Sequence, residues 1–267
     1  MILEERAYIK MKFSKRMDLF GESIFTTLAN MRSERKKQGL EVIDLSIGAP
    51  NIPPTQEVME TIAKEAMKPE NYLYAIKDSV DLQNTVKEWY ERRYGVVIDP
   101  TTELTSLLGS QDGLAHLALT LVDEGDTVLV QDPCYPIFRD GPLLAGAHVV
   151  TMPLLKENDY LIDFDRIDEK TAQDAKYMIV SYPNNPTCGV ANDEFYKKLI
   201  VFAKKYNIMV LHDNAYSELL FEGPGHSFLE FEGAKDVGIE FNSLSKTYGL
   251  AGARIGFALG NKEIIGK

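Results

Sequence analysis

Cysteine is scarce in this chain of 267 residues, which contains only Cys134 and Cys188. Two cysteines so far apart are too few for a disulfide framework or for a zinc site built on cysteine. We therefore expect two free thiols in a reducing compartment, and the sequence offers no candidate metal site.

Positive charge is also in short supply. The chain has 29 Lys and Arg against 40 Asp and Glu, which gives a net charge of −11. Such an acidic surface repels nucleic acids and anionic membranes rather than recruiting them. The charge balance therefore favours neither as a partner.

Long apolar runs are absent as well. No run comes near the roughly 18 apolar residues that a membrane-spanning helix needs. The first residues, MILEERAYIKMKFSKRMDLFG, place charges every few positions and never build the apolar segment of a secretion signal. With 45% hydrophobic residues the chain can bury a large core, so we expect a cytoplasmic globular protein.

What the sequence does contain, from about residue 104 onward, is an alternation of short strands and helical patterns. Several strand candidates are continuous Val, Ile and Leu runs, which are typical of strands buried on both faces. The strand candidates are 104–108, 126–132, 148–154, 177–183, 208–214, 238–245 and 254–260. Segments such as 111–125 and 193–207 carry apolar residues at helical spacing. The alternation predicts an α/β domain on a mostly parallel, seven-stranded sheet.

The first hundred residues have a different character. Helices are predicted over 20–39, 55–68 and 82–95, the last ending at a glycine cap. An extended piece rich in Pro and Gly, EVIDLSIGAPNIPPT, separates the first two. We divide the chain into an N-terminal segment, 1–55, and a large domain, 56–267.

Polar residues gather where several predicted strands end. Ligands of open α/β sheets bind outside the carboxyl ends of the strands, so these positions are the first candidates for a site. Gly109, Ser110 and Gln111 follow a strand and open a helix, whose backbone N–H groups suit a phosphate. A simple helix cap by Ser110 would explain the same residues.

Four further candidates follow other strands. Asp213 ends a very apolar run, where a buried carboxylate needs a cation or several donors; capping the next segment is its alternative role. Tyr216 and Tyr135 can each pack in the core or contact a ligand ring. Asn185, between prolines in PNNPT, is either part of a rigid turn or a ligand contact.

Lys246 has the most unusual surroundings. It lies in SLSKTYGLAGARIG, among serines and small residues and eight positions before Arg254. A lysine is a good nucleophile only when neutral, and burial beside another cation lowers its pKa toward that state. Arg254 carries a planar fork that suits a phosphate. The plainer alternative is a surface lysine in a glycine-rich loop.

One ligand would satisfy all of these groups. It needs a phosphate, an aldehyde to condense with an amine, a ring nitrogen to pair with a carboxylate, and a ring hydroxyl. Pyridoxal 5′-phosphate (PLP) has all four. A carboxylate about 4 Å from the ring nitrogen would favour its protonated form by roughly 4 kcal/mol, and the ring could then accept electrons. The candidate residues are Gly109, Ser110, Gln111, Tyr135, Asn185, Asp213, Tyr216, Ser243, Lys246 and Arg254.

The same motifs show a family resemblance. The chain resembles the class I and II aminotransferases of the PLP fold type I superfamily, and it is most similar to the aspartate, aromatic and L,L-diaminopimelate enzymes. The matching segments keep the family's order across nearly the whole chain: DLSIGAPNIPPT, GSQDGLAHLALTL, DPCYPIF, YPNNPTCGV, DNAYSEL and SLSKTYGLAGARIG. The resemblance implies a fold type I large domain, and PLP-dependent transfer of an amino group between an L-amino acid and a 2-oxo acid.

The resemblance also implies roles for the catalytic and ring-binding residues. Lys246 would form the Schiff base with the cofactor and move a proton between the substrate Cα and the cofactor. Asp213 would pair with the ring nitrogen, Tyr216 and Asn185 with the ring oxygen, and Tyr135 would stack on the ring.

The phosphate and substrate contacts follow from the same resemblance. The residues implied to hold the phosphate are Gly109, Ser110, Gln111, Ser243 and Arg254. Gly48 and Asn185 lie where such enzymes contact the substrate. Tyr74 resembles the tyrosine that reaches the neighbouring subunit's cofactor in a homodimer, with Tyr72 as its rival.

Two departures from the family pattern stand out. The family usually reads Asn-Pro-Thr-Gly, whereas this chain has Cys188 after the threonine and its glycine one place later. Family members also continue into a C-terminal small domain whose arginine binds the substrate carboxylate, and nothing after Lys267 supplies it. We therefore expect a C-terminally truncated fragment that binds PLP poorly or not at all and does not turn over amino acids efficiently.

Two other functions share parts of this pattern. A PLP-dependent lyase or decarboxylase of the same fold would use the same cofactor residues. A non-catalytic PLP-sensing domain of a transcription regulator would carry a basic DNA-binding module upstream, which residues 1–40 do not offer.

Overall fold

The computed structural model describes residues 11–267. The first ten residues, which belong to the stretch that argued against a secretion signal, lie outside the described residues. The chain divides into two compact units, with the boundary in the sequence between Gly48 and Ala49.

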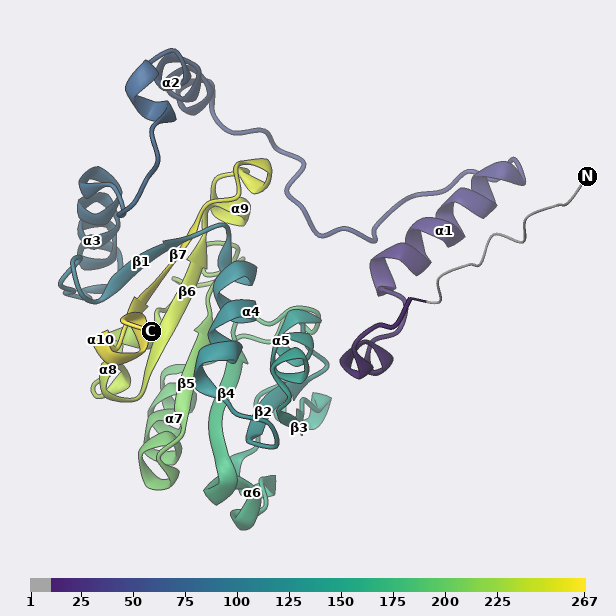
Figure 1. The fold of residues 1–267 in the computed structure, drawn as a ribbon, viewed down its shortest axis with the longest axis vertical. Helices are drawn as coiled ribbons and strands as arrows, with labels where there is room; N and C mark the ends of the chain where they lie inside the picture. The colour runs from purple at the N-terminus through teal and green to yellow at the C-terminus, as the bar shows by residue number, and fades with distance from the viewer. Residues whose placement is uncertain (1–10) are drawn as a thin grey trace, which may run out of the picture. The chain divides into compact units, whose positions relative to one another are not determined.

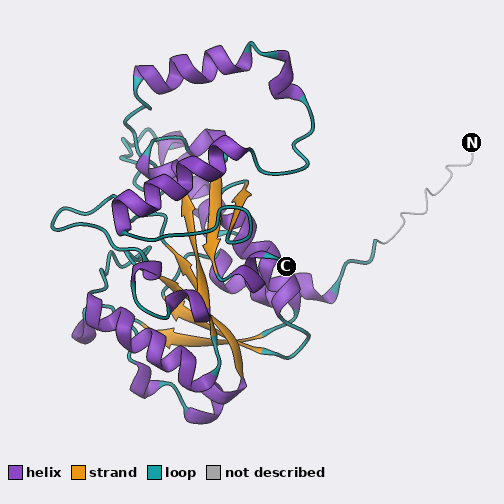
Figure 2. Ribbon diagram, turned by 90° about the vertical axis from the view of Figure 1, so that its left-hand side faces the viewer, coloured by secondary structure: helices purple, strands orange, loops and turns teal. Residues whose placement is uncertain are grey.

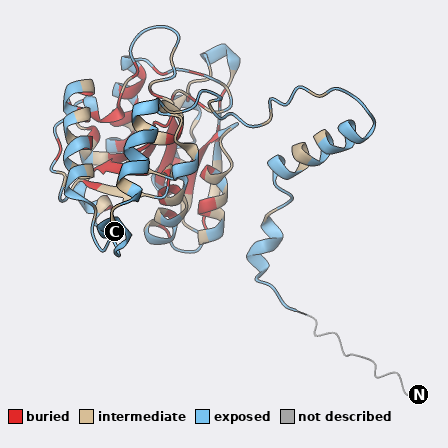
Figure 3. Cartoon of the chain, turned by 90° about the horizontal axis from the view of Figure 1, so that it is seen from above, coloured by how far each residue is buried: buried red, intermediate tan, exposed pale blue. Residues whose placement is uncertain are grey.

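The described part of the first unit holds a short 3-10 helix, η1 (Lys15–Leu19), and one longer helix, α1 (Ile24–Lys37). No residue of α1 is buried, as its pale blue and tan ribbon shows (Figure 3). Three of its large apolar side chains, Ile24, Phe25 and Met31, are exposed. The helix therefore gains little stability from packing within its own unit.

The second unit begins with α2 (Gln56–Ala66), the 3-10 turn η2 (Pro69–Tyr72) and α3 (Val80–Tyr94). The side chain of Ser79 accepts a hydrogen bond from the Leu82 N–H and so caps the start of α3. Gly95 ends the helix in the left-handed conformation with φ +67°, as the sequence predicts.

A seven-stranded sheet forms the centre of the second unit (Figures 1 and 2). The strands run in the order β1-β7-β6-β5-β4-β2-β3, and only β7 is antiparallel to its neighbours. Their bounds are β1 (Leu104–Leu107), β2 (Thr127–Asp132), β3 (His148–Pro153), β4 (Ala175–Ser181), β5 (Met209–Asp213), β6 (Gly238–Ser243) and β7 (Gly256–Gly260). The predicted mostly parallel sheet is confirmed.

Helices alternate with these strands along the chain. The bounds of those after β1 are α4 (Ser110–Leu121), α5 (Ile137–Ala145), α6 (Glu169–Asp174), α7 (Asp193–Tyr206), α8 (Ala234–Val237), α9 (Leu244–Thr247) and α10 (Lys262–Ile265), with 3-10 turns η3 (Lys156–Asn158), η4 (Phe164–Arg166), η5 (Phe228–Glu230) and η6 (Ala251–Ala253). No helix among the described residues is long and apolar enough to cross a membrane.

Two hydrophobic cores cover the two faces of the sheet. On β5, Val210 belongs to the core shared with α3, α7 and η5, whereas its neighbour Leu211 belongs to the core shared with α4 and α5. The alternation follows from the two-residue period of a strand. Burial concentrates in the sheet and on the helix faces against it (Figure 3).

Candidate active site

A buried carboxylate stands at the carboxyl end of β5. Asp213 is only 6% exposed, and within residues 11–267 one hydrogen bond reaches it, from the Ala215 N–H at 3.2 Å. Burial raises the pKa of this carboxyl to about 6, while the nearby His212 works against the rise. Asp213 therefore has accepting capacity left for a cationic donor.

Lys246 lies in α9, the short helix that directly follows β6, and β6 is the strand next to β5 in the sheet. Its Nζ is 5.8 Å from the centre of the Tyr216 ring. Burial lowers the pKa of Lys246, and the positive charge of Arg254 lowers it further. Both effects increase the fraction of neutral amine, which is the nucleophilic form.

Tyr216 and Asn185 come from separate loops and meet beside these groups. Asn185 Nδ2 donates to Tyr216 Oη at 3.2 Å. Burial raises the pKa of Tyr216, and the charge of Asp213 adds to the rise. The turn after β5 and the loop after β4 therefore meet through this hydrogen bond, and the predicted contact of both residues with the ring oxygen stays a prediction.

Tyr135 follows β2 and lies close to the same carboxylate. Its hydroxyl donates to Gln111 Oε1 at 2.8 Å, which links it to the first turn of α4. Burial raises the pKa of Tyr135, Asp213 raises it further, and Arg254 opposes both. Tyr135 is thus within electrostatic reach of both a carboxylate and a guanidinium of the site.

Small residues let Arg254 approach the start of α4. Its guanidinium donates to the carbonyl oxygens of Leu108, at 3.1 Å, and Ala251, at 3.2 Å. Gly109 precedes the helix with φ +91°, and a Cβ there would lie 3.0 Å from Arg254 Cζ and collide with Nη2. Only glycine accepts both the conformation and the crowding at this position without strain.

Ser243 supplies hydroxyl and backbone groups at the end of β6. Its side chain caps α9 by accepting a hydrogen bond from the Ser245 N–H at 3.2 Å, and it donates to Ser245 Oγ at 3.0 Å. A Cβ on Gly256 would lie 2.9 Å from the Ser110 nitrogen, so the strand β7 runs close against the start of α4. The predicted phosphate-binding groups therefore flank one another.

Three further predicted positions are Gly48, Tyr74 and its rival Tyr72. Gly48 belongs to the first unit, so its predicted role stays a prediction. Tyr74 is 99% exposed and points into solvent. Its rival Tyr72 already donates its hydroxyl to the Ala66 carbonyl at 2.6 Å. The role of Tyr74 at a neighbouring subunit likewise stays a prediction.

The departure at Cys188 has a visible conformational consequence. Cys188 adopts φ +60°, the left-handed conformation that glycine accepts most readily. Gly189, one place later, has no positive φ, and a Cβ there would lie 3.1 Å from Tyr160 Cβ. The cysteine therefore occupies the position in the turn where a glycine would fit without strain.

A group of buried polar residues behind the site was not predicted from the sequence. Glu240 and His212 are fully buried within β6 and β5. Both lie inside strands that read as buried on both faces, where a charged or polar side chain must find partners. That signal was present in GIEFNS and IMVLHD and could have identified them.

Comparison with known proteins gives a consistent result. The sequence profile of the family described as aminotransferase class I and II matches residues 41–267. The chain is 44% identical over 257 residues to an LL-diaminopimelate aminotransferase of Aquifex aeolicus, and 43% identical to one of Dehalococcoides mccartyi. These matches cover 95% and 96% of this chain, and the chain spans 66% of the length of each relative.

Solved structures agree with the sequence matches. A probable N-succinyldiaminopimelate aminotransferase of Thermus thermophilus superposes with a TM-score of 0.87 at 36% identity, covering 91% of this chain and 66% of that one. An aspartate aminotransferase of Thermus thermophilus with maleate gives a TM-score of 0.87 at 26% identity, covering 96% and 66%. The second unit has the fold of the large domain of these enzymes. The chain therefore belongs to the class I and II aminotransferase family, whose members depend on pyridoxal 5′-phosphate.

Proposed function

We propose that this chain binds PLP at the carboxyl ends of β5 and β6 and serves to transfer an amino group between an L-amino acid and a 2-oxo acid. One observation carries the proposal. Lys246, an amine whose pKa is lowered by burial and by Arg254, lies beside Tyr216, and Tyr216 in turn is close to the buried Asp213.

The groups around Arg254 fit the phosphate of the cofactor. The first turn of α4 presents backbone N–H groups and the positive end of the helix dipole. Arg254 lies against Gly109 and adds a permanent positive charge, and the Ser243 hydroxyl would turn from Ser245 Oγ, to which it now donates, toward the phosphate. Gly109 leaves the space that a side chain would close.

The groups around Asp213 fit the ring. A buried carboxylate with a single hydrogen-bond donor suits a protonated ring nitrogen, which would supply both a second donor and a positive charge. We propose that Tyr216 and Asn185 hold the ring oxygen and that Tyr135 packs on the ring. Asp213 would keep the nitrogen protonated.

The bound cofactor supplies an electron-accepting ring, so that the Cα–H bond of an attached amino acid becomes acidic. Lys246 Nζ is the group of this chain that would take that proton from the substrate Cα and deliver it to the cofactor. The ring of Tyr216 is a neighbour of this amine, with its centre 5.8 Å from Nζ.

The relatives guide the choice of first substrate. Two are named LL-diaminopimelate aminotransferase, so we propose a dicarboxylic or diamino L-amino acid of this class as the amino donor to test. We also propose a homodimer, in which the exposed Tyr74 would reach a neighbouring subunit, and a cytoplasmic location.

The visible spectrum of the purified chain with added PLP tests the proposal. We expect an absorbance band of a cofactor bound to an amine, which Lys246→Ala abolishes and which the exposed-lysine control Lys262→Ala retains. No such band in the wild-type chain with PLP would overturn the proposal.

The products then separate the proposed reaction from its rivals. Transamination of LL-diaminopimelate with a 2-oxo acid yields a new oxo acid and a new amino acid. Release of ammonia or carbon dioxide instead would indicate a lyase or decarboxylase and would contradict the proposed reaction while leaving the cofactor site intact.

A further inference from the structure

A second buried carboxylate lies behind the site, on the other face of the sheet. Glu240 is 0% exposed and sits in the middle of β6. Its neighbours Ile239 and Phe241 belong to the core shared with α4 and α5, so its side chain points to the opposite face, where α3, α7 and η5 pack.

Glu240 accepts four hydrogen bonds. Oε1 accepts from Tyr90 Oη at 2.8 Å and from Ser227 Oγ at 2.9 Å. Oε2 accepts from the Phe228 N–H at 2.7 Å and from His212 Nδ1 at 3.1 Å. The donors come from α3, from η5 and its cap, and from β5, so one carboxylate ties three separate parts of the chain to β6.

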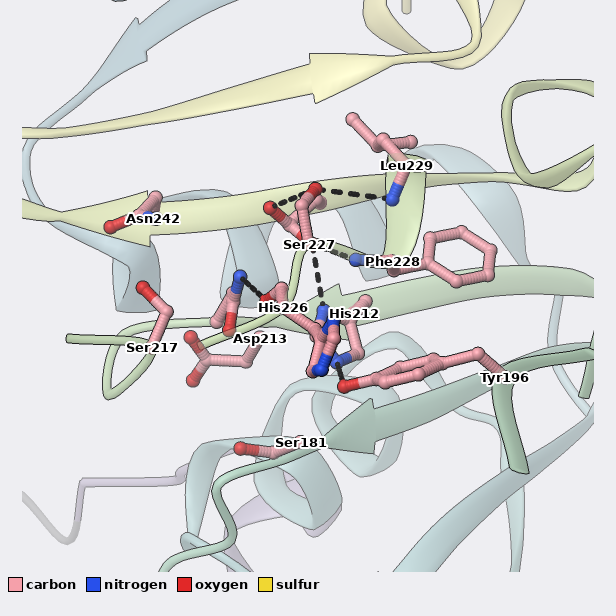
Figure 4. A network of polar contacts seen from close by, with 12 residues as sticks. Ser181, Tyr196, His212, Asp213, Ser217, His226, Ser227, Phe228, Leu229 and Asn242 are labelled. Atoms are coloured by element: carbon pink, nitrogen blue, oxygen red, sulfur yellow. Dashed lines mark hydrogen bonds and ion pairs between the residues drawn. The ribbon is translucent and has the colours of Figure 1, made fainter. Parts of the chain in front are cut away.

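One branch of this network leads to Asp213. His212 is the register partner of Glu240 on β5, and the Tyr196 hydroxyl lies 3.4 Å from its Nε2. Figure 4 shows His212 with Tyr196 on one side and Ser227 on the other, and Asp213 beside it. Fixing the imidazole therefore fixes the strand end from which Asp213 projects on the opposite face.

The other branch leads to Ser243. Tyr90 Oη, besides donating to Glu240, accepts a hydrogen bond from Asn242 Nδ2 at 3.2 Å. Asn242 Oδ1 accepts in turn from the Ser243 N–H at 2.7 Å. The last residue of β6, which caps the helix of Lys246, is thereby connected to the same carboxylate.

We propose that Glu240 is a positioning residue of the cofactor site, which holds the carboxyl ends of β5 and β6, and with them Asp213 and Ser243, from the opposite face of the sheet. The proposal rests on the proposed binding of PLP between these two residues. A carboxylate with four donors has little freedom to move, and each donor that is lost loosens a strand end.

The chain offers a closely matched pair of variants for the test. Tyr90→Phe removes a buried hydroxyl that makes two hydrogen bonds within the network. Tyr182→Phe removes a buried hydroxyl that also makes two, to the Ile162 N–H and the Tyr160 carbonyl, each at 3.0 Å, outside the network. Ser227→Ala is a second network variant that removes a different donor to Glu240.

Amide hydrogen exchange of the cofactor-free chain is the first measurement. We expect Tyr90→Phe and Ser227→Ala to speed exchange at residues 213–217 and 241–245 by about tenfold, the effect of losing one ordinary hydrogen bond. Tyr182→Phe should leave these amides unchanged and speed exchange around residues 160–162. Equal exchange at the two strand ends in Tyr90→Phe and the wild type would overturn the inference.

Affinity for PLP, followed by the absorbance of the bound cofactor, is the second measurement. We expect Tyr90→Phe to weaken PLP binding about tenfold and to shift the absorbance band. Tyr182→Phe should do neither. The difference should persist when the two variants melt at the same temperature, because it depends on the position of the hydroxyl and not on overall stability. Equal affinity in the two variants would also overturn the inference. A wild-type chain that binds no PLP would instead overturn the proposed function, and the exchange measurement alone would then decide the positioning role.

Discussion

Glu240 and Asp213 are two buried carboxylates on adjacent strands, one within β6 and one at the end of β5, yet they are satisfied very differently. Glu240 accepts four hydrogen bonds, whereas among the described residues Asp213 accepts one. Burial alone penalises both ionised groups. The difference teaches that the carboxylate of Glu240 is saturated by the protein itself, while the carboxylate of Asp213, on the other face, retains capacity for a ligand.

Two residues of the site adopt an unusual backbone conformation. Arg254, next to the start of α4, and Cys188, in the loop of Asn185, both adopt the left-handed region, at φ +54° and +60°. Such conformations cost energy in residues other than glycine and cluster at functional sites. The site thus combines an unsaturated carboxylate with unusual backbone conformations, and three substitutions can test the contrast between the two carboxylates.

The largest expected effect is that of Glu240→Ala. It leaves four buried donors without their acceptor, so we expect the free energy of unfolding to fall by about 3 to 5 kcal/mol, or folding to fail. Denaturant unfolding of the cofactor-free chain measures it, with the exposed Glu88→Ala on α3 as the control. A loss below about 1 kcal/mol would mean that the network contributes little.

Asp213→Asn is expected to have the opposite sign. Because burial raises the pKa of Asp213 from 3.8 to about 6, the folded state holds this proton more tightly than the unfolded chain. The resulting stability is present below about pH 4 and is lost as the pH rises through about 6. The variant cannot ionise, so at about pH 8 it should be more stable than the wild type by up to about 3 kcal/mol.

Unfolding of the cofactor-free chains at about pH 8 and about pH 4 tests this sign, since the gain should vanish at the lower pH. Asp165→Asn, at an exposed carboxyl, is the control. PLP affinity should fall in Asp213→Asn at the same time. A variant less stable than the wild type at both pH values would contradict the contrast between the two carboxylates.

Gly109→Ala should have the smallest effect on stability. The added methyl group is strained at φ +91° and displaces the Arg254 guanidinium, which costs about 1 to 2 kcal/mol. Thermal unfolding and PLP affinity should both decline. Gly252→Ala, where a Cβ meets nothing within 4 Å and φ is not positive, is the control and should change neither. Equal behaviour of the two variants would argue against close packing of Arg254 at the site.

Much of the site could be predicted because its residues follow strands. Asp213, Tyr216 and Lys246 each come at or just after the carboxyl end of a strand whose apolar run is plain in the sequence. Parallel strands bring such ends to one edge, so local patterns sufficed to place them together. Asp213 caps a turn through the Ala215 N–H, and no helix begins there, so its alternative role as a helix cap does not apply.

The network behind the site could not be predicted in the same way. Tyr90 and Glu240 are separated by 150 residues, and Tyr90 reads as one more apolar position of an amphipathic helix. Only the packing of α3 against β6 makes its hydroxyl a donor. The sequence reveals that a buried Glu needs partners, but it does not say which.

By itself the sequence determined the strands, the helices and the residues that gather at the strand ends, because each depends on patterns within some ten neighbouring positions. The tertiary structure alone decided which of two buried carboxylates is saturated and which keeps a place for a ligand. The reason is physical: hydrogen-bond donors reach a buried acceptor through the packing of distant elements, and that packing is a property of the whole fold.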